Sequence, residues 1–318
     1  MIYPWLQTQW QHLLSQHQQQ RLPHALLIEG PAGLGKLALA EDFAALVLCE
    51  SNGQSACGVC RSCVLLSAGN HPDYFKLQLE EDAKNIKIEA VRELIANLEQ
   101  HAHQGGYQVA ILQAADKLNR AAANALLKTL EEPAGKVLII LVSDQSAALP
   151  ATLLSRCQKI ICRGCDSAET KLWLERNLTK PVASLDWLLQ AVDYAPLKAA
   201  QLAEANYLLL RDQWLWQLVA LKNQELSVLK VVADWTKQDS AILLTSLQLI
   251  GLDMLRLSLG VKYEPHSEYS QNLMNLQARL GLAQCLYFLR SVQRTTELAK
   301  AANNLNWQML LENLLLNF

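Results

Sequence analysis

The stretch from Asn119 to Cys157 constrains the fold of this chain more than any other. Residues 121–130 are rich in alanine and leucine, which favour a helix, and Asn119 can cap its N-terminus. Glu132 should end that helix, because a residue before a proline avoids the helical region. Residues 136–142 form a nearly continuous apolar run, as is typical of a strand buried on both faces of a parallel sheet. A short helix over 149–155 should follow, so the stretch predicts one slice of an α/β domain.

A glycine-rich turn near the N-terminus predicts a phosphate-binding loop. A short apolar strand over 25–28 leads into Gly30-Pro-Ala-Gly33-Leu-Gly35-Lys36, with the spacing G-x-x-x-x-G-K. Glycines let backbone N–H groups converge on a phosphate, and a helix N-terminus and a lysine add positive charge. The next position should carry the hydroxyl that ligates Mg²⁺, but it is Leu37. Two outcomes stay open: the loop binds nucleotide without its metal, or it keeps its shape for packing alone.

Two further positions that ATP hydrolysis needs are also missing. In a working P-loop ATPase the strand predicted at 108–112 should end in Asp-Glu, which hold Mg²⁺ and position the attacking water. Counted back from the helix that ends at Glu132, those places fall on Gln113 and Ala114. Asp116 lies further into the turn, where we predict a turn or cap carboxylate. The loss of three catalytic positions from an intact framework predicts an ATPase fold that has stopped hydrolysing ATP.

Half of the eight cysteines lie within fifteen residues, at Cys49, Cys57, Cys60 and Cys63. The last three follow C-x-x-C spacing, which suits tetrahedral zinc, and Gly58 can adopt the backbone conformation of a tight knuckle. Four unrelated thiols or an iron–sulfur cluster are the alternatives, although the usual C-x2-C-x2-C-x3-C run is not met. A set of four cysteines leaves no open coordination position, so the predicted zinc is structural. We predict that His71 is a turn residue. The three later cysteines at irregular spacing are predicted to be core thiols, namely Cys157, Cys162 and Cys165.

Charge and hydropathy narrow the possible partners. The net charge is −2, so the chain has no global basic footprint, and any contact with nucleic acid must be local or shared with partner chains. No apolar run reaches the length of a membrane span, and the N-terminus lacks the pattern of a signal peptide. We therefore expect a cytoplasmic protein without membrane contact, whose cysteines are metal ligands or buried thiols.

The motifs together resemble those of the clamp-loader branch of the AAA+ ATPases. The runs N-A-L-L-K-T-L-E-E-P at 124–133 and S-R-C at 155–157 are specific to bacterial clamp-loader subunits. Within this branch the chain is similar to the delta-prime family of DNA polymerase III, which has a four-cysteine zinc module after the first helix, a degenerate ATP site and an intact S-R-C arginine. The retained Gly35-Lys36 departs from the most degenerate members of that family. Lys198 stands where the active ATPases carry a sensor arginine.

This resemblance implies a fold of three domains. Residues 1–163 would form an AAA+ P-loop domain with a zinc module inserted at 49–63. Residues 164–206 would form a small helical lid domain, and residues 207–318 an all-α collar domain for oligomerisation. The change of character after Cys162, beyond which every segment predicts a helix, agrees with the first boundary.

The resemblance also implies a function. The chain would be the non-hydrolysing stator of the clamp loader, a subunit of the polymerase holoenzyme with no chemistry of its own. It would join gamma/tau-type ATPases and delta in a hetero-pentameric ring that loads the sliding clamp on primed DNA. Arg156 would act in trans as an arginine finger at a neighbour's ATP site, unless it is a surface salt bridge or a DNA-phosphate contact. A gamma/tau-like active ATPase and a zinc-bearing nucleic-acid-binding module are the alternatives.

Overall fold

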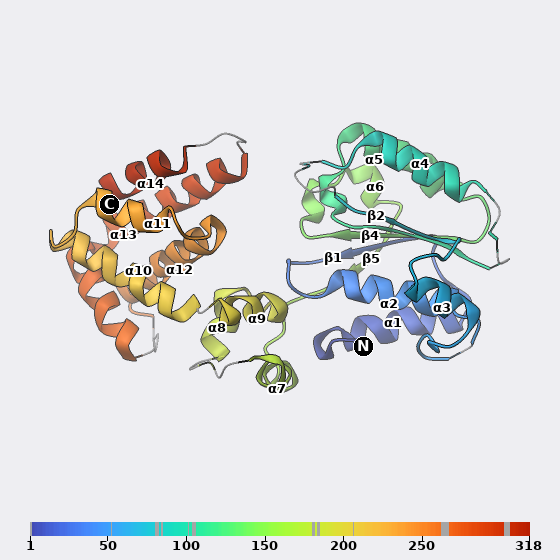
Figure 1. The fold of residues 1–318 in the computed structure, drawn as a ribbon, viewed down its shortest axis with the longest axis horizontal. Coiled ribbons are helices and arrows are strands. Elements are labelled where there is room, and N and C mark those ends of the chain that lie inside the picture. Colours follow the sequence, from blue (N-terminus) through green and yellow to red (C-terminus); the bar gives the residue numbers. More distant parts are fainter. Residues whose placement is uncertain are drawn as a thin grey trace. The chain divides into compact units, whose positions relative to one another are not determined.

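The chain divides into two compact units. The computed structural model describes residues 2–51, 53–79, 83, 85–100, 102–103, 106–179, 182, 185–205, 207–261, 267–301 and 306–318. The first unit comprises Met1–Asn177 with Val192–Ala199, and the second comprises Leu178–Ala191 with Ala200–Phe318 (Figure 1). The expected three-domain division at 163 and 206 stays a prediction.

A five-stranded parallel sheet forms the centre of the first unit, in the order β2-β3-β4-β1-β5. Its strands are β1 (Ala25–Glu29), β2 (Tyr74–Leu77), β3 (Gln108–Leu112), β4 (Val137–Ser143) and β5 (Gln158–Ile161). Every residue of β3 and β4 is buried, as their continuous apolar sequences predict. Because all strands run the same way, the residues that follow β1, β3, β4 and β5 meet at one edge of the sheet.

Helices cover both faces of this sheet. Figure 1 shows α4, α5 and α6 on one face and α1 and α2 on the other. The helices and short 3₁₀ turns are η1 (Pro4–Leu6), α1 (Gln7–Gln18), α2 (Lys36–Leu48), α3 (Arg61–Ser67), α4 (Ile88–Leu98), η2 (Ala115–Lys117), α5 (Arg120–Glu131), η3 (Ser146–Ala148), α6 (Ala151–Leu154) and α7 (Ala168–Asn177). The N-cap predicted for α5 is confirmed, because Asn119 Oδ1 accepts the Ala122 N–H at 2.8 Å. One core cluster joins α4, α5 and α6 to the sheet.

The rest of the chain, where the structure describes it, is helical, as predicted. It contains α8 (Leu185–Ala191), α9 (Pro196–Glu204), α10 (Tyr207–Lys222), α11 (Val228–Trp235), α12 (Ser240–Ser258), α13 (Ser267–Ala301) and α14 (Trp307–Leu316). The first turn of α9 belongs to the first unit and the rest of it to the second. Within the second unit, Trp214 and Trp235 are fully buried, whereas Trp216 is about half exposed. A positive φ of 66° at Gly281 breaks α13 into two helical segments.

Among the helices that the structure describes, α12 is long and apolar enough to cross a bilayer by length and composition alone. Its Leu247, Ile250 and Met254 are completely buried within the second unit, and it packs along α13. It also carries Asp253 and Arg256, which interrupt its apolar sequence. A core helix of a helical bundle has these same properties, so the length and composition of α12 are weak evidence for a membrane span.

Candidate nucleotide loop and metal centre

The glycine loop keeps the backbone of a phosphate-binding loop. It connects the end of β1 to Lys36, the first residue of α2. Gly33 and Gly35 have φ values of +84° and +81°, which side-chain-bearing residues rarely adopt. A Cβ atom on Gly30 would lie 2.1 Å from the Cys162 carbonyl oxygen, so the loop also needs glycine there for close approach to the segment after β5. The predicted strand–loop–helix arrangement is therefore present.

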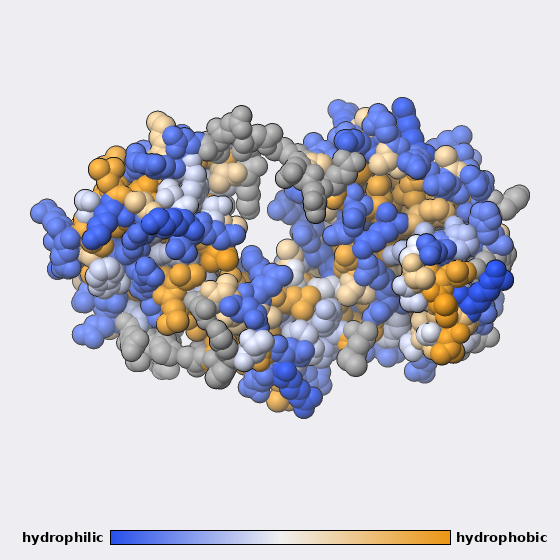
Figure 2. Space-filling model, viewed as in Figure 1, coloured by the Kyte–Doolittle hydropathy of each residue, from blue (hydrophilic) through white to orange (hydrophobic). Residues whose placement is uncertain are grey.

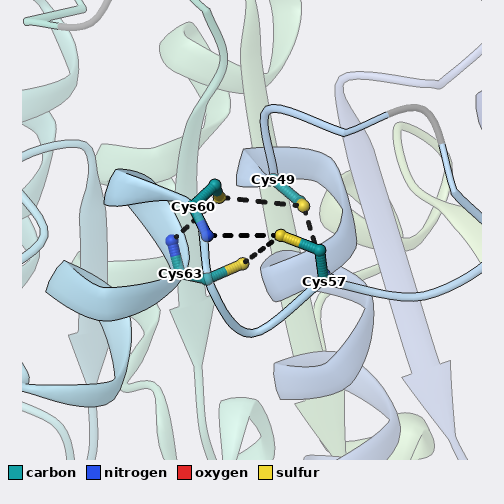
Figure 3. Close-up of side chains that lie close together, drawn as sticks. All are labelled: Cys49, Cys57, Cys60 and Cys63. Carbon is teal, nitrogen blue, oxygen red and sulfur yellow. Dashed lines mark hydrogen bonds between the residues drawn. The ribbon is translucent and has the colours of Figure 1, made fainter.

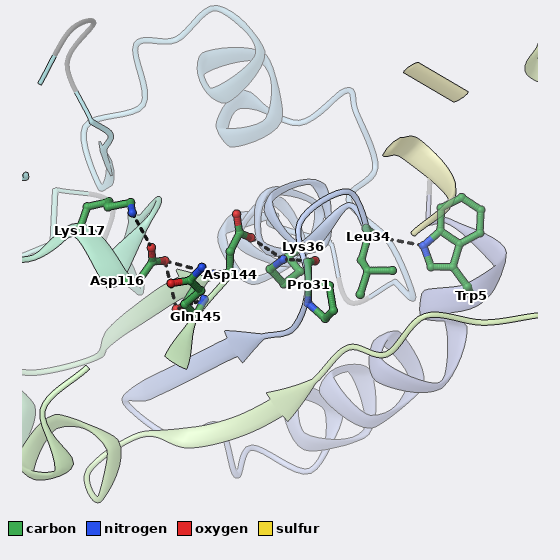
Figure 4. Close-up of polar contacts among 9 residues, drawn as sticks. Trp5, Pro31, Leu34, Lys36, Asp116, Lys117, Asp144 and Gln145 are labelled. Atoms are coloured by element: carbon green, nitrogen blue, oxygen red, sulfur yellow. Dashed lines mark hydrogen bonds and ion pairs between the residues drawn. The ribbon is translucent and has the colours of Figure 1, made fainter. Parts of the chain in front are cut away.

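The lysine of this loop is neutralised by the chain itself. Lys36 Nζ lies 2.6 Å from Asp144 Oδ1 and donates a hydrogen bond of 2.7 Å to the Pro31 carbonyl (Figure 4). The lysine side chain is only 3% exposed, whereas that of Asp144 is 54% exposed. Asp144 is the first residue after β4, so the parallel sheet delivers it to the same edge as the loop. An incoming phosphate would have to displace this carboxylate from its position.

The N-terminal segment packs over the loop from another direction. Trp5 Nε1 donates a hydrogen bond of 2.9 Å to the Leu34 carbonyl (Figure 4). The Tyr3 ring stacks on Trp5 at 4.9 Å, and Trp173 of α7 meets both rings edge-on. The ring of Tyr3 comes so close to Gly35 that a Cβ atom there would lie 2.4 Å from it. This contact of Trp5 with the loop was not predicted from the sequence.

The start of α9 covers the loop as well. The Leu197 N–H donates to the Gly33 carbonyl at 3.1 Å. A Cβ atom on Gly33 would lie 2.7 Å from Cβ of Lys198. Lys198, which the sequence placed at the sensor-arginine position, therefore packs directly against the glycine loop.

The two positions at which an active ATPase carries its catalytic Asp-Glu pair lie directly after β3, as predicted. Gln113 and Ala114 follow β3 directly, and Ala114 has a positive φ of 56°. Asp116 Oδ1 accepts hydrogen bonds from Ser143 Oγ and the Asp144 N–H, each at 3.1 Å (Figure 4). These bonds tie the turn after β3 to the end of β4, which confirms Asp116 as a turn carboxylate.

An open cavity of about 500 Å³ lies beside the loop at the same edge of the sheet. Its walls come from the ends of β1, β4 and β5, namely residues 29–31, 144–148 and 161–163. Asp144 faces both this cavity and Lys36. The strand ends thus leave space next to the glycine loop, while the loop's own cation is already paired.

The four cysteines of the predicted zinc module converge. Their Sγ atoms all lie within 4.8 Å of one another, with Cys49–Cys60 at 3.9 Å and Cys57–Cys63 at 4.0 Å (Figure 3). A tetrahedral zinc ion with Zn–S bonds of 2.3 Å would place its sulfur atoms about 3.8 Å apart. All four thiols are free, and their separations exclude disulfide bonds. The cluster can therefore hold a metal ion.

Backbone N–H groups point at the sulfur atoms. The Cys60 N–H lies 3.3 Å from Cys57 Sγ, and the Cys57 N–H lies 3.3 Å from Cys49 Sγ (Figure 3). Backbone N–H groups of Val59 and Cys60 lower the pKa of Cys57 to about 6, because they stabilise its thiolate. Burial raises the pKa of Cys63, the most enclosed of the four, to about 12. A bound cation would supply the charge that keeps Cys63 deprotonated.

Arg156 connects the S-R-C run at 155–157 to the N-A-L-L-K-T-L-E-E-P run at 124–133. It follows α6, donates through Nη1 to the Thr152 carbonyl at 2.7 Å and forms an ion pair with Glu131 at the end of α5. The side chains of Arg156 and Glu131 are 32% and 49% exposed. The next residue, Cys157, is buried in the core cluster with α5 and α6. The guanidinium of Arg156 thus lies at the surface, while the adjacent residue anchors the backbone in the core.

Comparison with known proteins places the chain in a family. The model for "DNA polymerase III, delta subunit" matches residues 5–164. The chain is 40% identical to DNA polymerase III subunit delta' of Pseudomonas aeruginosa over 236 residues, which cover 74% of this chain and 71% of that protein. It is 35% identical to subunit delta' of Yersinia pestis over 315 residues, which cover 97% of this chain and 89% of that protein. The chain belongs to the delta' family of DNA polymerase III.

The match to a tau/gamma subunit is shorter. The chain is 35% identical to DNA polymerase III subunit tau/gamma of Haemophilus influenzae over 162 residues, which cover 50% of this chain but only 23% of that protein. The delta' proteins of Pseudomonas aeruginosa and Yersinia pestis match 74% and 97% of the chain, so the resemblance proposed from the central stretch and the cysteines is confirmed at the level of the delta' family.

Several residues at these sites were missed by sequence reasoning. Asp144 was not predicted to pair with Lys36, although its place directly after a buried parallel strand could have suggested it. His71 was predicted to be a turn residue, but its ring is buried against Ser62 of the cysteine module. Neither contact leaves a spacing signal, because each depends on segments that meet only in the folded delta' chain.

Proposed function

We propose that this delta' family member is the non-hydrolysing stator of the clamp loader. The observation that carries the proposal is the ion pair between Lys36 and Asp144, in a loop that also lacks the Mg²⁺ hydroxyl. Gln113 and Ala114 can neither hold Mg²⁺ nor position an attacking water. Such a chain keeps the framework of a motor subunit while performing no hydrolysis itself.

The stator assembles with gamma/tau-type ATPases and delta in a hetero-pentameric ring in the cytoplasm, and the ring loads the sliding clamp on primed DNA. The helices beyond residue 163 serve as the lid (164–206) and the collar (207–318) of the AAA+ arrangement. Several large apolar side chains of the second unit reach its surface, and Figure 2 shows apolar patches there. The most exposed are Leu209, Leu229, Met309 and Leu316. Subunit contacts in the collar would bury such side chains.

Arg156 acts in trans in this proposal, as the arginine finger of a neighbouring ATPase. A planar, permanent cation suits the charge that develops on a transferred phosphoryl group. Its present partner Glu131 is half exposed, and exposed ion pairs contribute only ~0–1 kcal/mol. Exchange of Glu131 for a partner's phosphate therefore has a low cost to this chain.

The metal in the cysteine cluster is zinc, and its role is structural. Four thiolates complete a tetrahedral shell, so no position is left for a substrate or water. When bound, zinc would cross-link the end of α2 to the start of α3. An iron–sulfur cluster is the alternative that elemental analysis distinguishes.

Reconstitution tests the proposed function. The purified chain is assayed for ATP turnover alone and after mixing with tau/gamma-type and delta subunits, the sliding clamp and primed DNA. We expect no turnover alone, co-elution with the ATPase subunits, and clamp loading that depends on this chain. Turnover by the isolated chain that Lys36→Ala abolishes would identify an active ATPase instead. Binding to nucleic acid without any association with the ATPases would identify a nucleic-acid-binding module.

A further inference from the structure

A buried serine joins the two halves of the cysteine cluster. Ser62 lies between Cys60 and Cys63 and is 1% exposed. Its Oγ donates to the Leu48 carbonyl at 2.5 Å, and its N–H donates to Glu50 Oε1 at 3.2 Å. Leu48 and Glu50 are the two residues that flank Cys49. One side chain and one N–H therefore fasten the segment that carries Cys49 to the segment that carries the other three thiols.

A buried histidine supports this serine from the sheet. His71 Nε2 lies 2.8 Å from Ser62 Oγ, and the Asp73 N–H donates to His71 Nδ1 at 3.1 Å. Since Nδ1 accepts, Nε2 carries the ring proton and donates it to Ser62 Oγ, whose own hydrogen points to the Leu48 carbonyl. Burial lowers the pKa of His71, against an opposing effect of the Asp73 carboxylate, so the ring is neutral at pH 7.

This direction of hydrogen bonding excludes a nucleophilic role for the pair. A histidine acting as general base needs a free lone pair on the nitrogen next to the serine, and here that nitrogen carries the proton. Ser62 is also closed to solvent. The pair can therefore hold groups in place but cannot activate the serine.

The histidine is itself fixed to the central sheet. Asp73 is 1% exposed, its Oδ1 accepts the His103 N–H at 2.7 Å, and its carbonyl accepts the Val109 N–H of β3 at 2.9 Å. Asp73 immediately precedes β2. A continuous chain of hydrogen bonds thus runs from the sheet through His71 and Ser62 to both sides of Cys49.

We propose that Ser62 and His71 are positioning residues for the metal, because they hold Cys49 at bonding distance from the other three thiols before the ion arrives. The proposal rests on the zinc site of the proposed function. Without these hydrogen bonds, zinc would have to order the Cys49 segment as it binds. The conformational entropy lost in this ordering would make the free energy of zinc binding less favourable. Outer residues that orient metal ligands typically affect metal affinity by about 10- to 100-fold.

The matched pair Ser62→Ala and Ser67→Ala tests the proposal. Each variant removes one hydroxyl from α3, but Ser67 is exposed and its Oγ bonds only to the Val64 carbonyl of the same helix. Zinc affinity is measured by competition with a chromogenic chelator, and the cobalt(II) protein reports ligand geometry through its visible absorption bands. We expect about tenfold weaker zinc binding and altered cobalt bands for Ser62→Ala. We expect wild-type behaviour for Ser67→Ala.

The metal-free proteins separate positioning from general support of the core. If Ser62 only supported the core, Ser62→Ala would destabilise the metal-free and zinc-bound forms equally, and zinc affinity would stay unchanged. That result would overturn the proposal. A larger loss of stability in the zinc-bound form than in the metal-free form would support the proposal. Zinc affinity and the free energies of unfolding of these two forms are linked in one thermodynamic cycle.

Substitutions of His71 provide a second test if Ser62→Ala does not fold. His71→Gln keeps an N–H donor near Ser62 Oγ, whereas His71→Leu removes it, so we expect zinc affinity to decrease in the order wild type, Gln, Leu. Equal affinities in all three proteins would overturn the proposal. Wild-type protein that binds neither zinc nor cobalt would instead overturn the metal site on which the proposal rests.

Discussion

Asp144 Oδ1 lies 2.6 Å from Nζ of Lys36 and forms an ion pair with it. In a nucleotide-binding P-loop this lysine would contact a phosphate instead. The two residues come from different strand ends, the lysine from the loop after β1 and the aspartate from the end of β4. Because Lys36 is buried, its charge needs a partner whether or not nucleotide is present. The carboxylate therefore stabilises the empty loop and competes with any anion that enters it.

Removal of this carboxylate should increase the affinity of the loop for anions. We expect Asp144→Ala to bind a fluorescent ATP analogue about tenfold more tightly than wild type, a difference of ~1.4 kcal/mol. Hydrolysis should remain absent, since Leu37, Gln113 and Ala114 are unchanged. Fluorescence anisotropy at constant ionic strength measures the effect.

Asp166→Ala is the matched control for that substitution. Asp166 forms an exposed ion pair with Lys171 and has a similar exposure to Asp144. Its removal should leave nucleotide affinity unchanged. Equal affinities of wild type and Asp144→Ala would show that Trp5 and Lys198, which pack on the loop, rather than the carboxylate, keep phosphate out.

The metal should be needed for the cysteine module but not for the α/β core. We expect Cys57→Ser to lose its zinc and to expose the segment from Cys49 to Cys63 to proteolysis. The sheet and its helices have their own buried cluster, so thermal unfolding should remain cooperative. Inductively coupled plasma mass spectrometry and limited proteolysis measure the two effects. Iron in the wild-type protein, or zinc retained at full occupancy by Cys57→Ser, would contradict this prediction.

Thiol reactivity should distinguish the two groups of cysteines. Burial raises the pKa of Cys157 and of Cys162 to about 11, and it also raises the pKa of Cys285. The thiolate is the reactive form, so at pH 7.5 these three are protonated as well as shielded, and any reactivity should increase as the pH rises. With zinc bound, Cys165 should be the one rapidly reacting thiol. After chelation the three more exposed cysteines of the cluster should react as well, and the buried Cys63 more slowly, because burial raises its pKa to about 12.

Ellman's reagent measures this count under native conditions. Cys165→Ser should abolish the rapid phase before chelation and leave the reaction of the thiols released by chelation unchanged. Several rapid thiols in zinc-bound wild type would mean that the cluster does not hold its metal through all four cysteines.

Sequence reasoning predicted the features that depend on local spacing. The four thiols were found because C-x-x-C turns bring sulfur atoms together whatever the surrounding fold. Gln113 and Ala114 were located because they follow a strand of clear apolar sequence. The contacts of Lys36 with Asp144 and of Ser62 with His71 were missed because each joins segments whose approach is fixed by the folded chain. For His71, a single histidine in a turn gave no sign that its ring would be buried.

The arginine finger is the prediction that bears most directly on function. Arg156 and Glu131 form an exposed pair, so Arg156→Ala should change the free energy of unfolding by less than ~1 kcal/mol and leave zinc content unchanged. In the reconstituted loader it should lower ATP hydrolysis partially, since one ATP site of the ring is affected. Clamp loading should fall further, because all sites must act together. Arg156→Lys should not restore loading fully, since an ammonium lacks the planar fork.

Glu131→Ala is the control that separates the two partners of this arginine. It breaks the same surface ion pair but leaves the guanidinium free, so the loader should retain wild-type hydrolysis and loading. If Glu131→Ala and Arg156→Ala impair loading equally, the ion pair itself matters and Arg156 has a structural role. If Arg156→Ala assembles, hydrolyses and loads like wild type, the trans-acting role is wrong. A loss of both hydrolysis and loading confined to Arg156→Ala, with assembly intact, would support a place for the guanidinium in the partner's ATP site. A loss of loading with normal hydrolysis would point to a DNA-phosphate contact instead.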